Sequence, residues 1–183
     1  MSEPIAFIIN FILGAVAVLF LARFILQACR ADFYNPISQG IVRFTDPVLR
    51  PIRMVIPTYK NLDFAAFVAT WLVNIAMVAG VAVAMGGRTS VANALVSGLR
   101  ETLGLFLDIY WIAILAIIIL SFLAPGTSNP VSALLRQITD PILIPARRLV
   151  PPLGGLDLSP LLVFLVLGLI DRYVLPSIFQ TLF

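Results

Sequence analysis

The sequence contains no histidine and only one cysteine, Cys29. Zinc, haem, Ser-His and Cys-His sites take their ligands or their general base from these two residue types. A single thiol also cannot form a disulfide within the chain. These sites are therefore excluded, and we expect no metal or other cofactor.

Charge is scarce as well. Charged residues make up 11% of the 183 residues, apolar residues make up 61%, and the mean hydropathy is +1.06. Soluble domains are about half apolar and a quarter charged. Apolar runs of about 20 residues, which is the length that crosses hydrocarbon as a helix, occupy residues 5–28, 64–85, 103–123 and 158–183. The sequence therefore predicts an all-α integral membrane protein with four transmembrane helices.

The segment after the first apolar run occurs twice. Residues 35–57 align without a gap with residues 129–151, and the two copies share Asn35, Pro36, Asp46 and Pro47, which match Asn129, Pro130, Asp140 and Pro141. Such a match indicates a tandem duplication. We divide the chain into a first repeat, residues 1–89, and a second, residues 90–183. In the second, a polar helix at residues 91–99 is expected to lie along the outer surface before the third crossing.

The positive charges predict the orientation. Arginine and lysine are frequent between the first two apolar runs and between the last two, whereas the segment between the second and third runs has only Arg88 and Arg100. By the positive-inside rule, the two repeated segments face the cytoplasm and both termini lie outside. Because each repeat crosses the membrane twice, the repeats are parallel. This argues against the inverted-repeat plan of many transporters.

Each repeated segment predicts a short helix at the membrane surface. Asn35 and Asn129 are good N-caps, and the prolines that follow them fit the first helical position. Apolar residues then fall on one face, namely Ile37, Ile41 and Phe44 in the first copy and Val131, Leu135 and Ile138 in the second. A short amphipathic helix of this kind is expected to lie in the interface.

A second element is expected to begin at Asp46-Pro47 and at Asp140-Pro141, where a capping residue again precedes a proline. The later prolines at positions 51 and 57, or 145 and 151, are expected to kink and end it. The result is a bent, arginine-bearing bracket on the cytoplasmic side of each repeat.

Arginines near the cytoplasmic side are candidates for binding anionic lipid or a partner protein, since each cation near an anionic surface contributes about 1 kcal/mol. The candidates are Arg23, Arg43, Arg50, Arg53, Arg136, Arg147 and Arg148. Arg23, close to the inner boundary, is expected to extend toward lipid phosphate. That the cytoplasmic arginines only set the topology is an equally good interpretation.

Among the polar residues inside the predicted crossings, Asn74, Asp108, Asp171 and Arg172 most need an explanation. An ionisable group there costs at least about 2.5 kcal/mol unless it is paired. At 1.5 Å per residue, Asp108 and Arg172 lie roughly 8 and 9 Å below the outer boundary, so a pair between them is geometrically possible. A structural pair, or extension of the side chains toward the interface, is favoured over a path for protons or ions.

Several motifs point to a known family. The first copy contains Asp32-Phe33-Tyr34-Asn35-Pro36-Ile37-Ser38-Gln39 and Pro51-Ile52-Arg53, and the second contains Asp140-Pro141, Arg147-Arg148 and Gly155-Leu156-Asp157-Leu158-Ser159-Pro160. These motifs resemble those of the YggT family, also called YlmG, over nearly the whole chain. The resemblance implies a bacterial inner-membrane protein whose relatives are associated with membrane-complex biogenesis or osmotic tolerance. It implies no enzymatic reaction.

Two functions follow as hypotheses. The first is a non-enzymatic membrane scaffold or assembly factor that binds anionic lipid and a membrane-protein partner, or a second copy of itself, through the repeated cytoplasmic segments. The alternative is a small channel or transporter component for osmotic adaptation, with the four intramembrane polar residues along its route. The scarcity of such residues favours the scaffold. Neither hypothesis involves direct binding of nucleic acid or an evident small-molecule substrate.

Overall fold

The computed structural model describes residues 2–123, 129–150 and 157–181, and all the regular elements in these ranges are helical. In chain order they are α1 (Ser2–Ala28), α2 (Pro36–Val55), α3 (Phe64–Ala84), α4 (Val91–Leu123), α5 (Pro130–Leu149), α6 (Ser159–Leu169), η1 (Ile170–Val174) and α7 (Leu175–Thr181). Four stretches are long and apolar enough to cross a membrane: α1, α3, α4 and the run Ser159–Gln180. The predicted fold class is confirmed.

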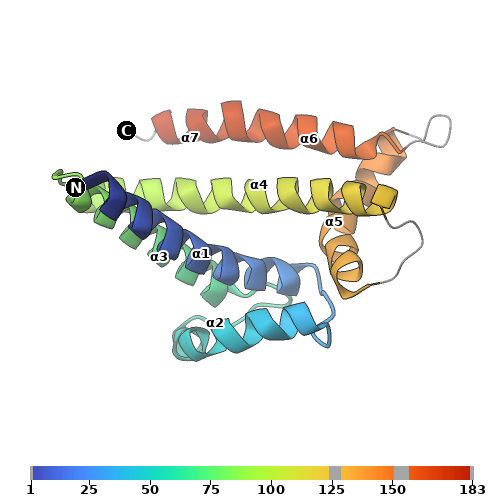
Figure 1. Ribbon diagram of the computed structural model, residues 1–183, viewed down its shortest axis with the longest axis horizontal. Coiled ribbons are helices and arrows are strands. Elements are labelled where there is room, and N and C mark those ends of the chain that lie inside the picture. Colours follow the sequence, from blue (N-terminus) through green and yellow to red (C-terminus); the bar gives the residue numbers. More distant parts are fainter. Residues whose placement is uncertain (1, 124–128, 151–156, 182–183) are drawn as a thin grey trace.

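The two repeats run in the same direction. Figure 1 shows α1 and α4 starting at the end of the molecule where α7 finishes, and α3 and α6–α7 returning to that end. The connecting helices α2 and α5 follow the last turns of α1 and α4 respectively. The structure is therefore a parallel duplication, in which α1, α2 and α3 correspond to α4, α5 and α6.

The connecting helices α2 and α5 are each continuous. Asn35 Oδ1 accepts a hydrogen bond from the backbone N–H of Ile37 (2.9 Å), and Asn129 caps α5 through a capping box, so both predicted caps are confirmed. The prediction that a new element begins at Pro47 and Pro141 is wrong, because each helix continues through its prolines. Both prolines lie on the exposed side of their helix. A carbonyl that loses its helical donor there can reach solvent or headgroups instead.

The helix α4 is a single element of 33 residues, so the prediction of a separate surface helix at residues 91–99 is wrong. Contacts with α3 hold its first turns in line. Trp71 Nε1 donates to the carbonyl of Leu95 (2.9 Å), and a Cβ added at Gly98 would lie 2.7 Å from Ile75 Cγ1, so this approach requires glycine. At 1.5 Å per residue α4 is about 50 Å long. It exceeds the ~30 Å hydrocarbon core and must tilt or project beyond it.

The last crossing contains a π-helical turn, η1, between α6 and α7. Pro176 has no N–H to donate to the carbonyl four residues earlier, and its ring would crowd that carbonyl in a regular α-helix. The wider turn just before Pro176 accommodates the ring. A π-turn adds one residue to the helical repeat and so changes which side chains face the bundle.

A hydrophobic cluster joins the two repeats. Its buried side chains come from α1, α4, α5, α6 and α7, namely Leu21, Ile25, Leu107, Tyr110, Ile114, Leu143, Ala146, Val163, Leu167 and Leu175. Two hydrogen bonds also link the repeats at the connecting helices. Asn35 Nδ2 donates to the carbonyl of Pro130 (2.6 Å), and the backbone N–H of Asp32 donates to Gln137 Oε1 (2.8 Å). The turn that precedes α2 is thereby held against α5.

The helices α1 and α3 pack much more closely than α4 and α6. The first turns of α3 present small, nearly fully buried side chains, namely Ala65, Ala66 and Ala69. The equivalent positions of α6 are Ser159, Pro160 and Val163. Small residues let helices approach in lipid, and the larger residues of α6 account for its looser contact with α4.

Candidate functional site

Three charged residues of repeat 1 form an ion-pair cluster beside α2. The Arg53 guanidinium lies 3.2 Å from Asp46 Oδ1 and 2.5 Å from Asp63 Oδ2. Asp46 and Arg53 lie two turns apart on one face of α2. Asp63 is fully buried and also caps α3, because its Oδ1 accepts from the backbone N–H of Ala66 (3.4 Å). Charge-assisted hydrogen bonds are stronger than neutral ones, so the cluster fixes α2 against the start of α3.

A second guanidinium, that of Arg23 on α1, joins this cluster. Arg23 is 8% exposed, lies 3.8 Å from Asp46 Oδ1, and sits over the ring of Phe33 at 4.9 Å from its centroid. The expectation that Arg23 extends toward lipid phosphate is therefore wrong. A carboxylate and an aromatic face lie within its reach, and both attract a guanidinium. Leaving aside the largely exposed Arg50, which also lies 3.6 Å from Asp46, the two arginines and two aspartates of the repeat 1 cluster balance in charge.

Repeat 2 contains the same three residues at equivalent positions: Asp140, Arg147 and Asp157. Arg147 Nε donates to Asp157 Oδ2 (2.8 Å), and its Nη1 lies 4.0 Å from Asp140 Oδ1. The three side chains are 39 to 47% exposed, whereas the side chain of Asp63 in repeat 1 has no exposed surface. The position equivalent to Arg23 is Ile117. The repeat 2 cluster is therefore open, and α4 supplies no guanidinium to it.

The ion pairs shift the pKa of two members of these clusters. Hydrogen bonding to Asp63 raises the pKa of Arg53 against the opposing effect of burial. Burial would raise the pKa of Asp157, but hydrogen bonds from Ser159 and the ion pair with Arg147 outweigh it and lower the pKa below its ordinary value. A lowered pKa means that ionised Asp157 stabilises the folded protein above the unfolded-state pKa. That contribution is lost as the pH falls through the folded-state pKa.

A cavity of about 630 Å³ lies beside the repeat 2 cluster, between α4, α5 and α6. Arg136, Asp140, Arg147 and Asp157 line its charged part. Apolar side chains line the rest, among them Ile117, Ile118, Phe122, Leu161 and Phe164. The cavity thus places charges of both signs next to an apolar wall.

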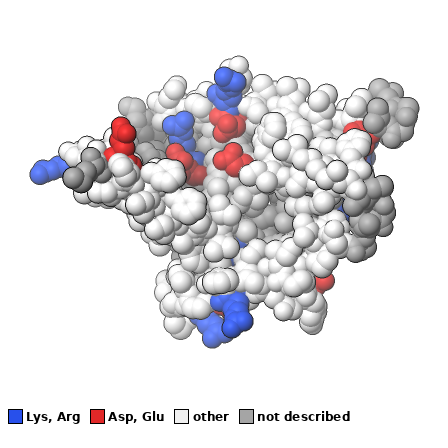
Figure 2. Space-filling view, in the orientation of Figure 1, with Lys and Arg blue, Asp and Glu red and all other residues white. Residues whose placement is uncertain are grey.

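Five of the seven candidate arginines are exposed, namely Arg43, Arg50, Arg136, Arg147 and Arg148. Arg50 lies 3.6 Å from Asp46, but 78% of its side chain is exposed. Figure 2 shows basic side chains gathered at the lower edge of the molecule, over α2. Arg43 and Arg50 share one face, turned by about a third of a circle from the exposed apolar stripe of Ile37, Phe44, Val48 and Val55. Whether any of the seven binds lipid or a partner stays a prediction.

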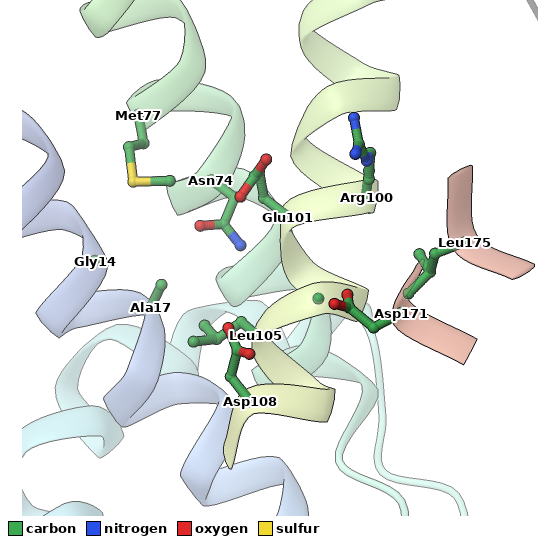
Figure 3. Close-up of a pocket in the computed structure, with 11 residues that line it drawn as sticks. Gly14, Ala17, Asn74, Met77, Arg100, Glu101, Leu105, Asp108, Asp171 and Leu175 are labelled. Atoms are coloured by element: carbon green, nitrogen blue, oxygen red, sulfur yellow. The ribbon is translucent and has the colours of Figure 1, made fainter. Parts of the chain in front are cut away.

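Polar residues of the crossings gather around a second cavity, of about 320 Å³, between α1, α3, α4 and the last crossing. Figure 3 shows Asn74, Asp108 and Asp171 around this cavity, with Glu101 of α4 above them. Asn74 is buried, and its Nδ2 donates to Thr102 Oγ1 (2.9 Å). The cavity therefore collects three carboxylates and the guanidinium of Arg100.

The pair between Asp108 and Arg172 that the sequence made geometrically possible is not formed. The ion pairs of the described residues do not include it, and Arg172 does not line the cavity. Asp171 lines the cavity instead, together with Asp108. Asp171 and Arg172 both lie in η1, whose wider turn changes which side chains face the bundle. The depth argument assumed a regular helix.

Sequence reasoning missed the partners of Arg53 and Arg147. Asp63 and Asp157 lie ten residues after their arginines, at the start of the next crossing. The available signal was that Leu62-Asp63 matches Leu156-Asp157 in the same gapless alignment. An acidic residue that follows an arginine at the same distance in both copies indicates an ion pair across the intervening turn.

Two parallel pairs of crossing helices, each with a capped connecting helix and an Asp-Arg-Asp cluster, define a duplicated all-helical protein with four potential membrane spans. The CCB3/YggT family model matches the chain twice, over residues 2–84 and 96–178. The chain belongs to the CCB3/YggT family. The two matches correspond to the two repeats seen in the structure.

The relatives come from bacteria and a plant. An uncharacterised protein of Pseudomonas aeruginosa is 42% identical over 169 residues, which cover 91% of this chain and 86% of the relative. The uncharacterised protein YggT of Escherichia coli strain K12 is 33% identical over 174 residues, 94% of this chain and 89% of the relative. YlmG homolog protein 2, a chloroplastic protein of Arabidopsis thaliana, is 44% identical over 78 residues, 40% of this chain and 30% of the relative. No solved structure matches.

Proposed function

We propose that this protein is a non-enzymatic scaffold or assembly factor of the bacterial inner membrane. In this proposal both termini lie outside, and α2 and α5 face the cytoplasm. The abundance of arginine in the two connecting segments supports that orientation. Through α2 and α5 the protein holds anionic lipid headgroups and a membrane-protein partner or a second copy of itself.

The observation that carries the proposal is the difference in ion pairing among the cytoplasmic arginines. Arg53 and Arg147 pair with carboxylates of the fold. Arg43, Arg136 and Arg148 are exposed and make no ion pair within 4.0 Å among the described residues. Cations that the fold does not neutralise are available to an anionic surface, where each contributes about 1 kcal/mol.

The geometry of α2 favours two contacts at once. Its exposed apolar stripe, which includes Phe44 and Val48, fits the boundary between headgroups and acyl chains. Arg43 and Arg50 point away from that stripe, toward the aqueous side. This favours an acidic surface of a partner protein as the ligand of these two arginines.

The test uses the full-length protein purified from membranes in mild detergent. Copurified proteins, bound lipids and the intact mass of the particle are measured for the wild type and for variants with Arg43→Gln and Arg50→Gln together, or Arg148→Gln. We expect these variants to fold normally and to lose the partner or the anionic lipid. Arg88→Gln, which removes a charge at the other end of the bundle, is the control. Unchanged partners and lipids in all the variants would contradict the scaffold function.

A channel or transporter component for osmotic adaptation remains the second candidate, and the cavity lined by Glu101, Asp108 and Asp171 favours it. Carboxylates inside a membrane protein often mark a route for cations or protons. Cation and proton flux into proteoliposomes would be compared between the wild type and the Asp108→Asn, Asp171→Asn double variant. Flux that the double variant abolishes supports this function, and absence of flux in the wild type eliminates it.

A further inference from the structure

The cavity of repeat 2, between α4, α5 and α6, can be explained by sequence differences between the two repeats. The larger side chains of α6, Pro160 and Val163, stand where α3 has Ala66 and Ala69, so α6 stays farther from α4 than α3 does from α1. The stacked rings of Trp111 and Phe164, 4.1 Å apart between centroids, bridge α4 and α6. Phe164 also lines the cavity, which continues from there to the charged cluster. The space is therefore a built feature between two crossings.

Repeat 1 shows which group the charged end of this cavity lacks. In repeat 1 the guanidinium of Arg23 reaches Asp46 from α1 and balances the second carboxylate of the cluster. In repeat 2 the equivalent residues, Ile117 and Asp140, both line the cavity. In repeat 1 the guanidinium of Arg23 fills this position. In repeat 2 the equivalent position is open to the cavity.

The cavity offers three kinds of contact to a ligand. Asp140 and Asp157 attract a cation, because two carboxylates here share one arginine of the cluster, Arg147. Arg136 lines the cavity and makes no ion pair with the described residues, so it is available to an anion. Ile118 and Leu161 belong to the apolar wall. A ligand that satisfies all three has a cation and an anion close together on an apolar chain.

We propose that this cavity binds one zwitterionic phospholipid whose headgroup ends in a primary ammonium, as in phosphatidylethanolamine. The ammonium lies at Asp140 and Asp157, the phosphate lies at Arg136, and one acyl chain follows the apolar wall between α4 and α6. The site shares Arg136 with the proposed scaffold surface, but it goes beyond the scaffold function because it does not depend on the exposed arginines of α2 or on Arg148.

Size and chemistry favour this occupant. A volume of about 630 Å³ lies in the range of small-ligand sites, roughly 300–1,000 Å³. A choline headgroup has no N–H to donate to the carboxylates. A purely anionic headgroup would bring no cation to them.

The experiment is a lipid titration of the full-length protein in detergent, followed by native mass spectrometry. The probes are phosphatidylethanolamine, phosphatidylcholine and phosphatidylglycerol with matched acyl chains. We expect the first phosphatidylethanolamine to bind at least about tenfold more tightly than phosphatidylcholine, since only the primary ammonium donates hydrogen bonds. Equal affinities of these two lipids would overturn the proposal without any need for a variant.

Two variants locate the site. Asp140→Asn should reduce the preference for phosphatidylethanolamine to near unity, and Ile117→Arg should do the same by placing a guanidinium where repeat 1 has one. Glu3→Gln, which removes an exposed carboxylate at the other end of α1, should keep the preference. A preference that survives both cavity variants, or phosphatidylglycerol as the tightest ligand, would contradict the proposal. Loss of anionic lipid upon Arg148→Gln, with the preference intact, separates this site from the scaffold surface.

Discussion

In repeat 1, Asp63 is fully buried and holds Arg53 at 2.5 Å, whereas in repeat 2 the equivalent Asp157 has 39% of its side chain exposed and holds Arg147 at 2.8 Å. The same residue types at the same spacing therefore occupy two environments. An ion pair that is sealed from water depends strongly on both partners, while an exposed pair contributes little. The comparison indicates that the repeat 1 cluster holds the fold together and that the repeat 2 cluster is accessible to a ligand.

The largest expected effect comes from removing the buried carboxylate. Asp63→Asn leaves the charge of Arg53 partly uncompensated and should lower the free energy of unfolding by about 3–5 kcal/mol. The matched variant Asp157→Asn should lower it by less than about 1 kcal/mol. Both are measured by denaturant titration in the same detergent. Equal losses would mean that burial does not distinguish the two repeats.

The next largest effect is expected where α3 packs against α4, at the junction between the repeats. Gly98→Ala places a Cβ 2.7 Å from Ile75 Cγ1 and 3.0 Å from the backbone nitrogen of Ile75, so α3 and α4 must separate. We expect a loss of about 1–3 kcal/mol in the free energy of unfolding. Gly168→Ala in α6, where nothing lies within 4 Å of the added Cβ, should be neutral or slightly stabilising. If the two variants have equal free energies of unfolding, α3 and α4 do not pack as closely at Gly98 as described.

Making repeat 1 resemble repeat 2 should have a moderate effect. Arg23→Ile removes a guanidinium that contacts Asp46 and Phe33, but Asp46 keeps Arg53 at 3.2 Å. Two nitrogens of Arg23, Nε and Nη1, are buried without a partner among the described residues, so the change also removes a desolvation cost. We expect a loss of about 1–2 kcal/mol in the denaturant titration. A loss as large as that of Asp63→Asn would show that Arg23 is the main cation of the cluster.

The smallest effect concerns pH. The lowered pKa of Asp157 implies that its ionised form stabilises the protein above the ordinary pKa of 3.8 and loses this contribution as the pH falls below it. The difference in melting temperature between the wild type and Asp157→Asn should therefore shrink between about pH 5 and pH 3. If the difference in melting temperature grows as the pH falls, the pKa of Asp157 is raised in the folded protein and not lowered.

Much of the fold could be predicted from the sequence because the signals are local or periodic. The four apolar runs identify the crossings, and Asn35-Pro36 and Asn129-Pro130 identify the starts of α2 and α5. The continuity of α4 could not be predicted in this way, because it depends on Gly98 packing against Ile75 of a different helix. The continuation of α2 through Pro47 was also missed, since the local capping pattern at Asp46 competes with an ion pair formed by the same residue.

The candidate sites were less predictable for the same reason. Arg53 and Arg147 were identified as functional candidates, but their carboxylate partners are visible only once the turn into the next helix brings Asp63 and Asp157 back to them. The cavity of repeat 2 exists because Ile117 replaces the arginine that repeat 1 has at position 23, and because Pro160 is larger than the equivalent Ala66. Such differences between equivalent positions acquire meaning only when the two repeats can be superimposed in three dimensions.

The measurement that tests the central comparison most directly is a pair of double-mutant cycles. One cycle combines Arg53→Gln with Asp63→Asn, and the other combines Arg147→Gln with Asp157→Asn, with unfolding free energies measured in one detergent. We predict a coupling energy of at least about 2 kcal/mol in repeat 1 and less than about 1 kcal/mol in repeat 2. Equal coupling energies, or a larger one in repeat 2, would contradict the conclusion that one cluster is sealed and the other open.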